Sequence, residues 1–304
     1  LLAVQGIESP VALLFQSILV NFYPMAAIVI VFLSIVRKWN LGPMKAAELR
    51  AQHEGKVYGD DARPMVADDV VGVKPLEGIQ HRAVNLVAPV LTMVVSIVVG
   101  IYVTGRLSAG EGAGLWDIIK ASSGSTAVLW AVIMSLVVLA SLNLFRGLPL
   151  NTFVDLIFKG MGGMIPVVSM LLLAFALGDA VRQLGTGVYV AGVISGILST
   201  KMAVIGLFLI SCFVAFSTGT SWGTFAVMVP IAIPMATTLD GSTPMFLAAV
   251  LGGGVFGDHC SPISDTTIIS SMASASDHID HVRTQIPFAS VGAAVTIVIY
   301  LIIA

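Results

Sequence analysis

Charged residues are scarce in this chain. Lys, Arg, Asp and Glu make up 11% of its 304 residues, whereas an average soluble domain has roughly 25%. Hydrophobic residues account for 57%, and the mean hydropathy is +0.98. Because so few polar groups cannot cover a soluble domain of this size, the composition predicts a polytopic, all-α integral membrane protein.

Cysteine is rarer still. Cys212 and Cys260 both lie in apolar surroundings, which excludes a disulfide framework and leaves no zinc-ligand spacing. The net charge of −2 is an average over a soluble loop and buried spans, so it says little about partners. Nothing in the sequence suggests nucleic-acid binding, and no cofactor is predicted. An initiator Met is also missing. Since the chain begins at Leu1 inside an apolar sequence, we expect upstream residues to be absent and infer no signal peptide.

Long apolar runs dominate what remains. Residues 11–36 carry no charge over 26 residues, more than the roughly 20 that a helix needs to cross a bilayer. Asn21 and Pro24 interrupt this run and predict a kink or a polar contact near its middle. Further spans are predicted at 83–104, 126–145, 161–181, 186–199, 202–218 and 286–304, and 148–160 is expected to lie along the membrane interface.

One segment has a different composition. Residues 37–82 contain eight of the fifteen Lys and Arg residues, and a short loop with this bias stays in the cytoplasm. Its stretch 43–55 has Pro near the start and Gly at the end, which predicts a short surface helix. Lys201 is predicted on the same side. We therefore expect the end of an N-terminal membrane part (1–36), a cytoplasmic loop (37–82) and a transport membrane domain (83–304).

Two polar stretches interrupt the apolar sequence of the C-terminal third. Residues 216–224 (FSTGTSWGT) combine two glycines with small hydroxyl residues, and 257–267 (GDHCSPISDTT) carries two carboxylates, an imidazole and four hydroxyls. Irregular backbone at membrane depth is tolerated where it is buried in protein or lines a cavity. Short apolar pieces on both sides of a polar break, as at 202–239 and 244–275, predict the discontinuous helices of secondary transporters, in one inverted repeat plus part of the other.

The chemistry of the two stretches favours a cation site. A charge in hydrocarbon costs at least ~2.5–3.5 kcal/mol, so a passive span gives no reason for both Asp258 and Asp265. Carboxylates suit a hard cation such as Na⁺. Ser264 or Asp265 can also cap a helix that begins near Thr266, which explains one carboxylate but not both. A buried carboxylate holds either a proton or Na⁺, which is sufficient for exchange.

The predicted site therefore draws on both stretches. His259 is expected to act either as a proton relay or as a hydrogen-bonded structural partner. A close-packed interface of small residues, or an interfacial Trp, is the simpler explanation of the first stretch. We nevertheless favour a binding site there, because the stretch contains many hydroxyl groups. The predicted ion- or substrate-binding residues are Asp258, His259, Ser261, Ser264, Asp265 and Thr266, together with Thr218, Gly219, Thr220, Ser221 and Trp222.

Two other polar groups carry weaker signals. Asp179 and Arg182 are three residues apart, on one helical face. They are interpreted as an interfacial ion pair or, less favoured, as a coupling element of the transport core. His278, Asp280 and His281 resemble a metal cluster, but they lie at the end of a span, without a cysteine or a known motif. A solvated turn is the preferred interpretation there.

The polar stretches also resemble a known family. GDHCSPISDTTIISS (257–271), followed by DHIDHVRTQIPFA (277–289), resembles the signature of the NhaC-type sodium/proton antiporters. FSTGTSWGTFAVMVPIAIPMA (216–236) and LAFALGDAVRQLGTGVYVA (173–191) are similar to two further blocks. The resemblance implies a secondary carrier with inverted repeats in the bacterial inner membrane, exchanging Na⁺ for H⁺ through a core site in both stretches. Relatives also exchange organic anions such as malate and lactate.

Three functions remain in competition. The first is Na⁺/H⁺ antiport, with the bilayer, Na⁺ and H⁺ as partners and a homo-oligomer possible. The second is coupled exchange of a small organic anion, which needs a cation for the carboxylate, and Arg182 is the one candidate in the membrane. An intramembrane hydrolase is disfavoured because His259 directly follows Asp258 and the hydroxyl residues are spread as ligands would be. A channel suits two buried carboxylates less well than stoichiometric exchange does. We expect a transporter and not an enzyme.

Overall fold

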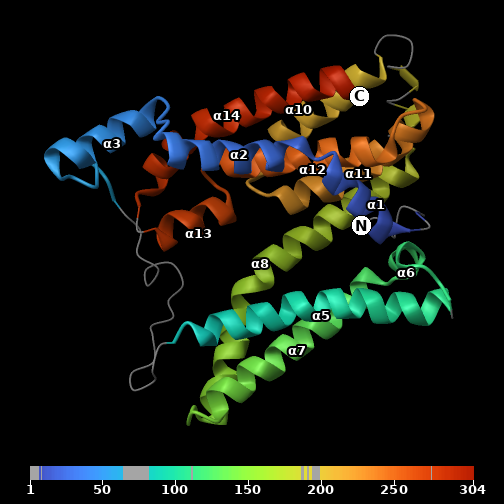
Figure 1. The fold of residues 1–304 in the computed structure, drawn as a ribbon, viewed down its shortest axis with the longest axis horizontal. Coiled ribbons are helices and arrows are strands. Elements are labelled where there is room, and N and C mark those ends of the chain that lie inside the picture. Colours follow the sequence, from blue (N-terminus) through green and yellow to red (C-terminus); the bar gives the residue numbers. More distant parts are fainter. Residues whose placement is uncertain are drawn as a thin grey trace. The chain divides into compact units, whose positions relative to one another are not determined.

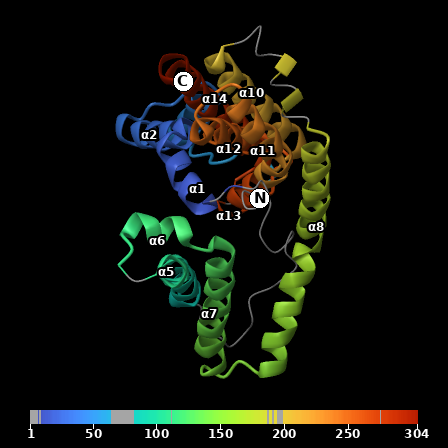
Figure 2. The same ribbon diagram turned by 90° about the vertical axis from the view of Figure 1, so that its right-hand side faces the viewer.

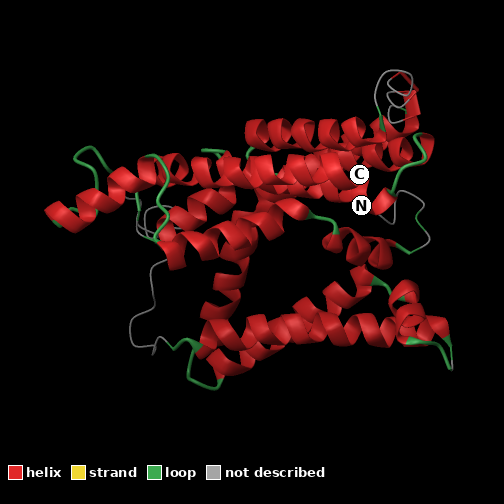
Figure 3. Cartoon of the chain, turned by 45° about the horizontal axis from the view of Figure 1, so that its top comes forward, coloured by secondary structure: helices red, strands yellow, loops and turns green. Residues whose placement is uncertain are grey.

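The computed structural model describes residues 7, 9–63, 82–110, 112–185, 188–189, 192–193, 199–274 and 276–304. In these ranges every regular element is a helix (Figure 3), which confirms the all-α prediction. The helices are α1 (Pro10–Leu19), α2 (Phe22–Arg37), α3 (Pro43–Glu54), α5 (Val84–Ala109), α6 (Leu115–Ala121), α7 (Gly124–Leu144), α8 (Leu150–Gln183), α10 (Thr200–Thr218), α11 (Ser221–Thr238), α12 (Thr243–Cys260), α13 (Asp265–Ala273) and α14 (His278–Ile303).

Most of the predicted spans are confirmed. Among the described residues, α5, α7, α10, α11 and α14 are each long and apolar enough to cross a membrane, and α1 with α2 passes the same test as a bent pair, either a broken span or a re-entrant loop. The bend of 44° falls at Asn21, as the sequence predicts. The surface helix is confirmed as α3, which has Pro43 in its first turn and ends at Gly55 in the left-handed conformation.

The helices around the two polar stretches are longer than predicted. α12 continues to Cys260 and reaches about 27 Å at 1.5 Å per residue, although it is not among the helices that are both long and apolar enough to cross a membrane. The first stretch likewise joins two full-length helices, α10 and α11, at Gly219 and Thr220. Only α13, with nine residues, is a short piece. Glycine and hydroxyl residues have low helix propensity, but tertiary packing stabilises a helix by more than this low propensity costs. The helices therefore extend through these residues.

One predicted boundary is replaced by a continuous helix. α8 runs without interruption from Leu150 to Gln183 and joins the predicted interfacial stretch 148–160 to the predicted span 161–181. The helix contains Gly160, Gly162 and Gly163. Glycine weakens a helix but does not remove its hydrogen bonds, so the helix can continue through these positions. Most of the predicted span 186–199 lies outside the described residues.

Contacts divide the chain into two compact units. Unit 2 comprises residues 2–15 and 75–169. Within it, α5 packs closely on α7 and α6, because a Cβ at Gly100 would meet Ala127 and one at Gly105 would meet the backbone of Ile118. Unit 1 comprises residues 16–74 and 170–304 and contains both polar stretches. The predicted division at residues 36 and 82 concerns membrane topology and stays a prediction.

The core of unit 1 is a parallel pair of helices, α10 and α12. Phe208 meets Gly253, Cys212 meets Gly257 and Phe216 bonds to Ser261, so contacting residues are 45 positions apart throughout. A Cβ on either glycine would collide with backbone atoms of α10. The bundle of α10, α11, α12 and α14 is seen in Figure 2, and α2 lies beside α12 and α14 (Figure 1). Glycine on one helix therefore fixes both the spacing and the register of the pair.

The two ends of α14 lie against different segments of unit 1. At its start, the Arg63 backbone N–H donates to Asp277 at 2.8 Å. At its end, Lys201 Nζ donates to the carbonyls of Leu301 and Ile302 at 3.3 and 3.2 Å. Segment 37–63 and Lys201 therefore contact opposite ends of α14. The prediction that both are cytoplasmic stays a prediction.

Packing at Gly257 predicts a large effect of the smallest side chain. Gly257→Ala would place a methyl group against the Cys212 carbonyl, and overpacking of this kind costs roughly 1–3 kcal/mol. We expect a clear loss of thermal stability of the detergent-solubilised protein, followed by circular dichroism. Gly206→Ala is the matched control, because a Cβ there meets nothing within 4 Å. Equal melting temperatures for the two variants would contradict this account of the helix pair.

Candidate functional site

Asp258 lies in the last turn of α12, where its side chain is buried and only 5% of the residue is exposed. α10 ends nearby at Gly219, because the two helices are parallel and in register. The C-terminal ends of two helices thus converge here. Each such end carries unpaired carbonyls and a partial negative charge. The surroundings of Asp258 therefore favour a cation.

Hydroxyl groups satisfy the oxygen atoms of Asp258. Ser264 Oγ donates to Oδ1 at 2.8 Å, and Thr266 Oγ1 donates to Oδ2 at 2.8 Å. Thr267 Oγ1 donates to the Asp258 backbone carbonyl at 3.2 Å. Hydrogen bonds of this kind compensate a carboxylate for the water lost on burial. Ser264 also accepts from the Thr267 N–H at 3.3 Å, which confirms that it caps α13.

The turn between α12 and α13 is held from two sides. Ser261 Oγ donates to the Phe216 carbonyl of α10 at 2.8 Å. Gly219 adopts φ +68°, and a Cβ there would lie 2.6 Å from the Ile263 carbonyl. From the other side, His278 Nε2 lies 2.6 Å from the Pro262 carbonyl and its Nδ1 lies 3.1 Å from Ser271 Oγ. His278 is half-buried, so the turn predicted there is only partly solvated.

The hydroxyls of the first stretch close helix ends. Thr220 caps α11 by accepting from the Gly223 N–H at 3.4 Å, and Thr218 donates to Val214 at 2.8 Å, within its own helix. Trp222 is 62% exposed and packs against Phe225. Ser221 is the first residue of α11. In the described part of the chain, the two stretches meet through Gly219 and Ser261 and not through a shared set of hydroxyl ligands.

Three predicted residues are only partly described. Asp265 begins α13, but its side chain lies outside the described part of the chain, and so does that of Arg182. Asp179 accepts a hydrogen bond from Gln183 Nε2 at 2.6 Å. The paired carboxylates at 258 and 265 and the Asp179–Arg182 pair therefore stay predictions. No cluster of three metal-ligating side chains occurs among the residues with described side chains.

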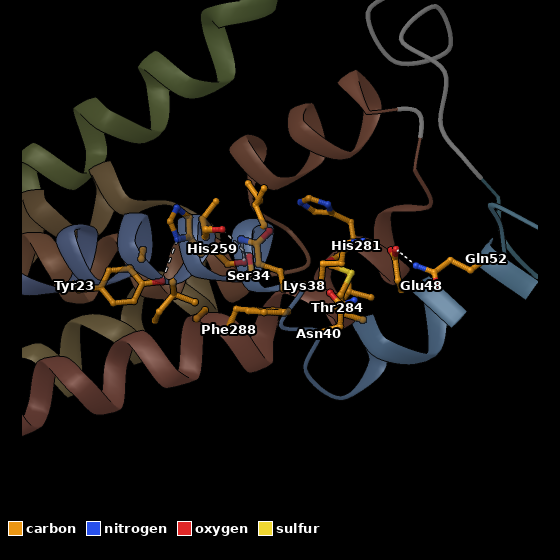
Figure 4. Close-up of a pocket in the computed structure, with 17 residues that line it drawn as sticks. Tyr23, Ser34, Lys38, Asn40, Glu48, Gln52, His259, His281, Thr284 and Phe288 are labelled. Atoms are coloured by element: carbon orange, nitrogen blue, oxygen red, sulfur yellow. Dashed lines mark hydrogen bonds between the residues drawn. The ribbon is translucent and has the colours of Figure 1, made fainter. Parts of the chain in front are cut away.

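His259 points into a cavity on the other side of α12. Its Nδ1 lies 3.1 Å from the hydroxyl of Tyr23, a fully buried residue of α2, and its backbone carbonyl accepts from Gln285 at 3.0 Å. The cavity has a volume of about 560 Å³. Figure 4 shows His259 and Tyr23 at one end and Glu48 and Gln52 of α3 at the other. This cavity is called the central cavity below.

The central cavity combines apolar walls with a few polar groups. Ile30, Val31 and Phe288 supply apolar surface, while Lys38 and His281 supply groups that can carry positive charge. Cavities of this volume and character accommodate small organic molecules. Asp258 does not line it, but its neighbour His259 does. The buried carboxylate and the cavity therefore meet at adjacent residues of one helical turn.

Comparison with known families decides what kind of protein this is. The model of the Na⁺/H⁺ antiporter family matches residues 2–304, which is nearly the whole chain. The chain belongs to the Na⁺/H⁺ antiporter family. The family resemblance inferred from the polar stretches is thereby confirmed.

Individual relatives of this antiporter-family chain cover different parts of it. An uncharacterized protein of Haemophilus influenzae is 28% identical over 288 residues, which are 93% of this chain and 53% of the relative. The malate-2H(+)/Na(+)-lactate antiporter of Bacillus subtilis is 30% identical over 95 residues, 31% of this chain and 20% of the relative. An uncharacterized Na(+)/H(+) antiporter of H. influenzae is 39% identical over 79 residues, 26% of this chain and 17% of the relative. The chain spans about half the length of the first relative, and no solved structure matches it significantly.

Several residues at the site of this antiporter-family chain were not predicted from its sequence. Tyr23 and Gln285 contact His259 from positions far away in the chain. Lys38 was assigned to a solvated loop but lines the central cavity. No local pattern marks such residues, because their role depends on long-range packing. A search for isolated polar residues inside apolar spans would have found Tyr23 and Gln285, but not Lys38.

Asp277 links the start of α14 to segment 37–63. Its carboxylate accepts from the backbone N–H groups of Asp280 at 2.9 Å and Arg63 at 2.8 Å. These hydrogen bonds, that of Asp280 first, lower the pKa of Asp277 below its ordinary value of 3.8. A group with a lowered pKa stabilises the fold above its unfolded pKa, and this contribution is lost as the pH falls through the folded pKa.

This linkage predicts a pH-dependent difference between the wild type and Asp277→Asn. Asn preserves the cap without the charge. We expect the wild type to be the more stable by roughly 0.5 kcal/mol near neutral pH, a small value because Asp277 is partly exposed. The difference should begin to fall near pH 4 and be lost only as the pH passes through the lowered pKa of the folded state. Thermal unfolding in detergent between pH 3 and 7 measures it. A difference that grew on acidification would contradict the assignment.

Proposed function

We propose that this chain carries the ion-translocating core of a secondary antiporter that exchanges Na⁺ for H⁺ at Asp258. The observation that carries the proposal is a buried carboxylate bonded by Ser264 and Thr266 where two helices end. A carboxylate in this position needs either a proton or a cation to offset its lost hydration. Binding of one then displaces the other, which produces exchange without a further device.

The surrounding groups suit Na⁺. Carboxylate, hydroxyl and carbonyl oxygens are the ligands of hard cations. Asp258 supplies the charge, the hydroxyls of Ser264 and Thr266 lie beside it, and the ends of α10 and α12 supply carbonyls. On binding, the hydroxyls would turn their lone pairs to the ion. Family membership supports a transporter and not an enzyme. We place the protein in the bacterial inner membrane, with segment 37–82 in the cytoplasm because of its Lys and Arg content.

Substitutions around Asp258 test this proposal. In inverted vesicles that contain the full-length protein and an imposed pH gradient, added Na⁺ should dissipate the gradient, and Asp258→Asn should abolish this response. Thr266→Ala should raise the apparent KM for Na⁺ roughly tenfold, since a hydrogen bond to a charged group contributes about 1.5–3 kcal/mol. Thr266→Ser keeps the hydroxyl and should stay near the wild type.

Ser270→Ala is the matched control for these variants. Ser270 lies on the same helix, but its hydroxyl donates to the Thr266 carbonyl and not to Asp258. The control should transport at the wild-type rate. Wild-type transport by Asp258→Asn, with protein present in the membrane at normal amounts, would refute the role of the carboxylate.

A second candidate function is exchange coupled to a small organic anion. The central cavity favours it, because Lys38 can neutralise a carboxylate beside apolar walls. The cavity thus supplies a positively charged side chain for the anion, a role for which the sequence indicated only Arg182. The similar B. subtilis protein bears the name of a malate-2H(+)/Na(+)-lactate antiporter. In this alternative, Asp258 binds the coupling ion and the cavity binds the anion.

Lys38→Gln distinguishes the two candidates. If the chain exchanges organic anions, transport should require malate or lactate, and this substitution should raise the apparent KM for the anion at least tenfold. Lys38→Arg keeps the charge and should restore most of the affinity. Lys56→Gln is the control, because Lys56 pairs with Asp60 at 2.8 Å on the exposed surface. Transport that needs Na⁺ alone and is indifferent to both anions would exclude the second candidate.

A further inference from the structure

A second cavity lies between the end of α2 and the start of α3. It has a volume of about 660 Å³ and contains three basic residues, Arg37, Lys38 and Lys45. Lys56–Asp60 is the one ion pair among the described residues, so none of these three cations is paired with a described carboxylate. Glu48 is the single acid in the lining, and it accepts from Gln52 at 2.7 Å. The cavity thus holds three cations against one carboxylate.

The position of this cavity matches the boundary of a bilayer. α2 belongs to a candidate membrane span and ends at Arg37. Ile28, Phe32 and Val36, along α2, are 70%, 64% and 58% exposed, as expected for a surface that faces lipid tails. Trp39 lines the cavity directly after these residues, and Trp is enriched where hydrocarbon meets water. Figure 1 shows α3 continuing beyond the end of α2.

Charge and shape together indicate what binds there. Three unpaired cations attract a phosphate group, and basic pockets at the ends of membrane helices bind acidic headgroups. α3 begins at Pro43 beside Lys45 without a side-chain cap, and the positive end of a helix also favours an anion. A free phosphate would use the cations but not the apolar surface. A phospholipid uses both, with its tails along α2.

We propose that this cavity is a binding site for an anionic phospholipid, whose headgroup phosphate contacts Arg37, Lys38 and Lys45 and whose acyl chains lie on α2. Arg37 and Lys45 line this cavity but not the central cavity. Their substitution therefore tests lipid binding without touching the residues assigned to transport. The site fixes the α2–α3 corner at the membrane surface.

Fluorescence of Trp39 provides the test. In a full-length variant that keeps Trp39 and replaces Trp116, Trp130 and Trp222 by Phe, quenching is measured in vesicles of phosphatidylcholine with brominated phosphatidylglycerol or brominated phosphatidylcholine. We expect strong preferential quenching by phosphatidylglycerol. Arg37→Gln/Lys45→Gln should lower the preference roughly thirtyfold, because each cation near an anionic lipid contributes a factor of about five. Arg37→Lys/Lys45→Arg should retain it, and so should Lys56→Gln.

A second measurement uses the unmodified tryptophans. Phosphatidylglycerol retained by the purified full-length protein after detergent washing should fall in the Arg37→Gln/Lys45→Gln variant, with an unchanged circular dichroism spectrum. Equal quenching by the two brominated lipids, or an unchanged preference in that variant, would overturn the proposal. Loss of the preference on addition of inorganic phosphate at millimolar concentration would also overturn it, since it would indicate a site for a soluble anion.

Discussion

The buried carboxylate of Asp258 is the constraint on which the rest of unit 1 depends. A charge with 5% exposure is tolerable only if donors surround it. Those donors, Ser264 and Thr266, belong to the start of the next helix. The turn between the two helices must therefore be fixed. The carbonyl of Phe216 holds it from α10 and the ring of His278 holds it from α14. Four helices thus meet around one desolvated group.

The same requirement explains where the glycines lie. α10 and α12 approach closely enough for their C-terminal ends to converge only because Gly253 and Gly257 have no side chain. At the end of α10, Gly219 takes a left-handed conformation and lies against Ile263. Each glycine lowers the stability of an isolated helix. Here the lost propensity is offset by packing that a larger residue would prevent.

The sequence predicted the local features and missed the long-range ones. Most of the spans, the bend near Asn21 and the cap at Ser264 follow from composition and neighbouring residues, and these were confirmed. The contact between Tyr23 and His259, 236 positions apart, has no local signature. The side on which Lys201 lies depends on how many spans precede it, and most of the predicted span 186–199 lies outside the described residues, so this assignment stays a prediction. For Asp265, the predicted partner of Asp258, the prediction still stands on the sequence alone.

Adjacent positions on α12 give a physical basis for coupling. Successive residues on a helix point about 100° apart, so Asp258 faces α13 while His259 faces the central cavity. α2 and α14 contact that same turn through Tyr23 and Gln285. A change in the charge state of Asp258 alters the hydrogen bonds that hold α13, and any resulting movement of this turn reaches the cavity through His259. Under the proposed function, ion binding at Asp258 and the shape of the central cavity would be coupled through one helical turn.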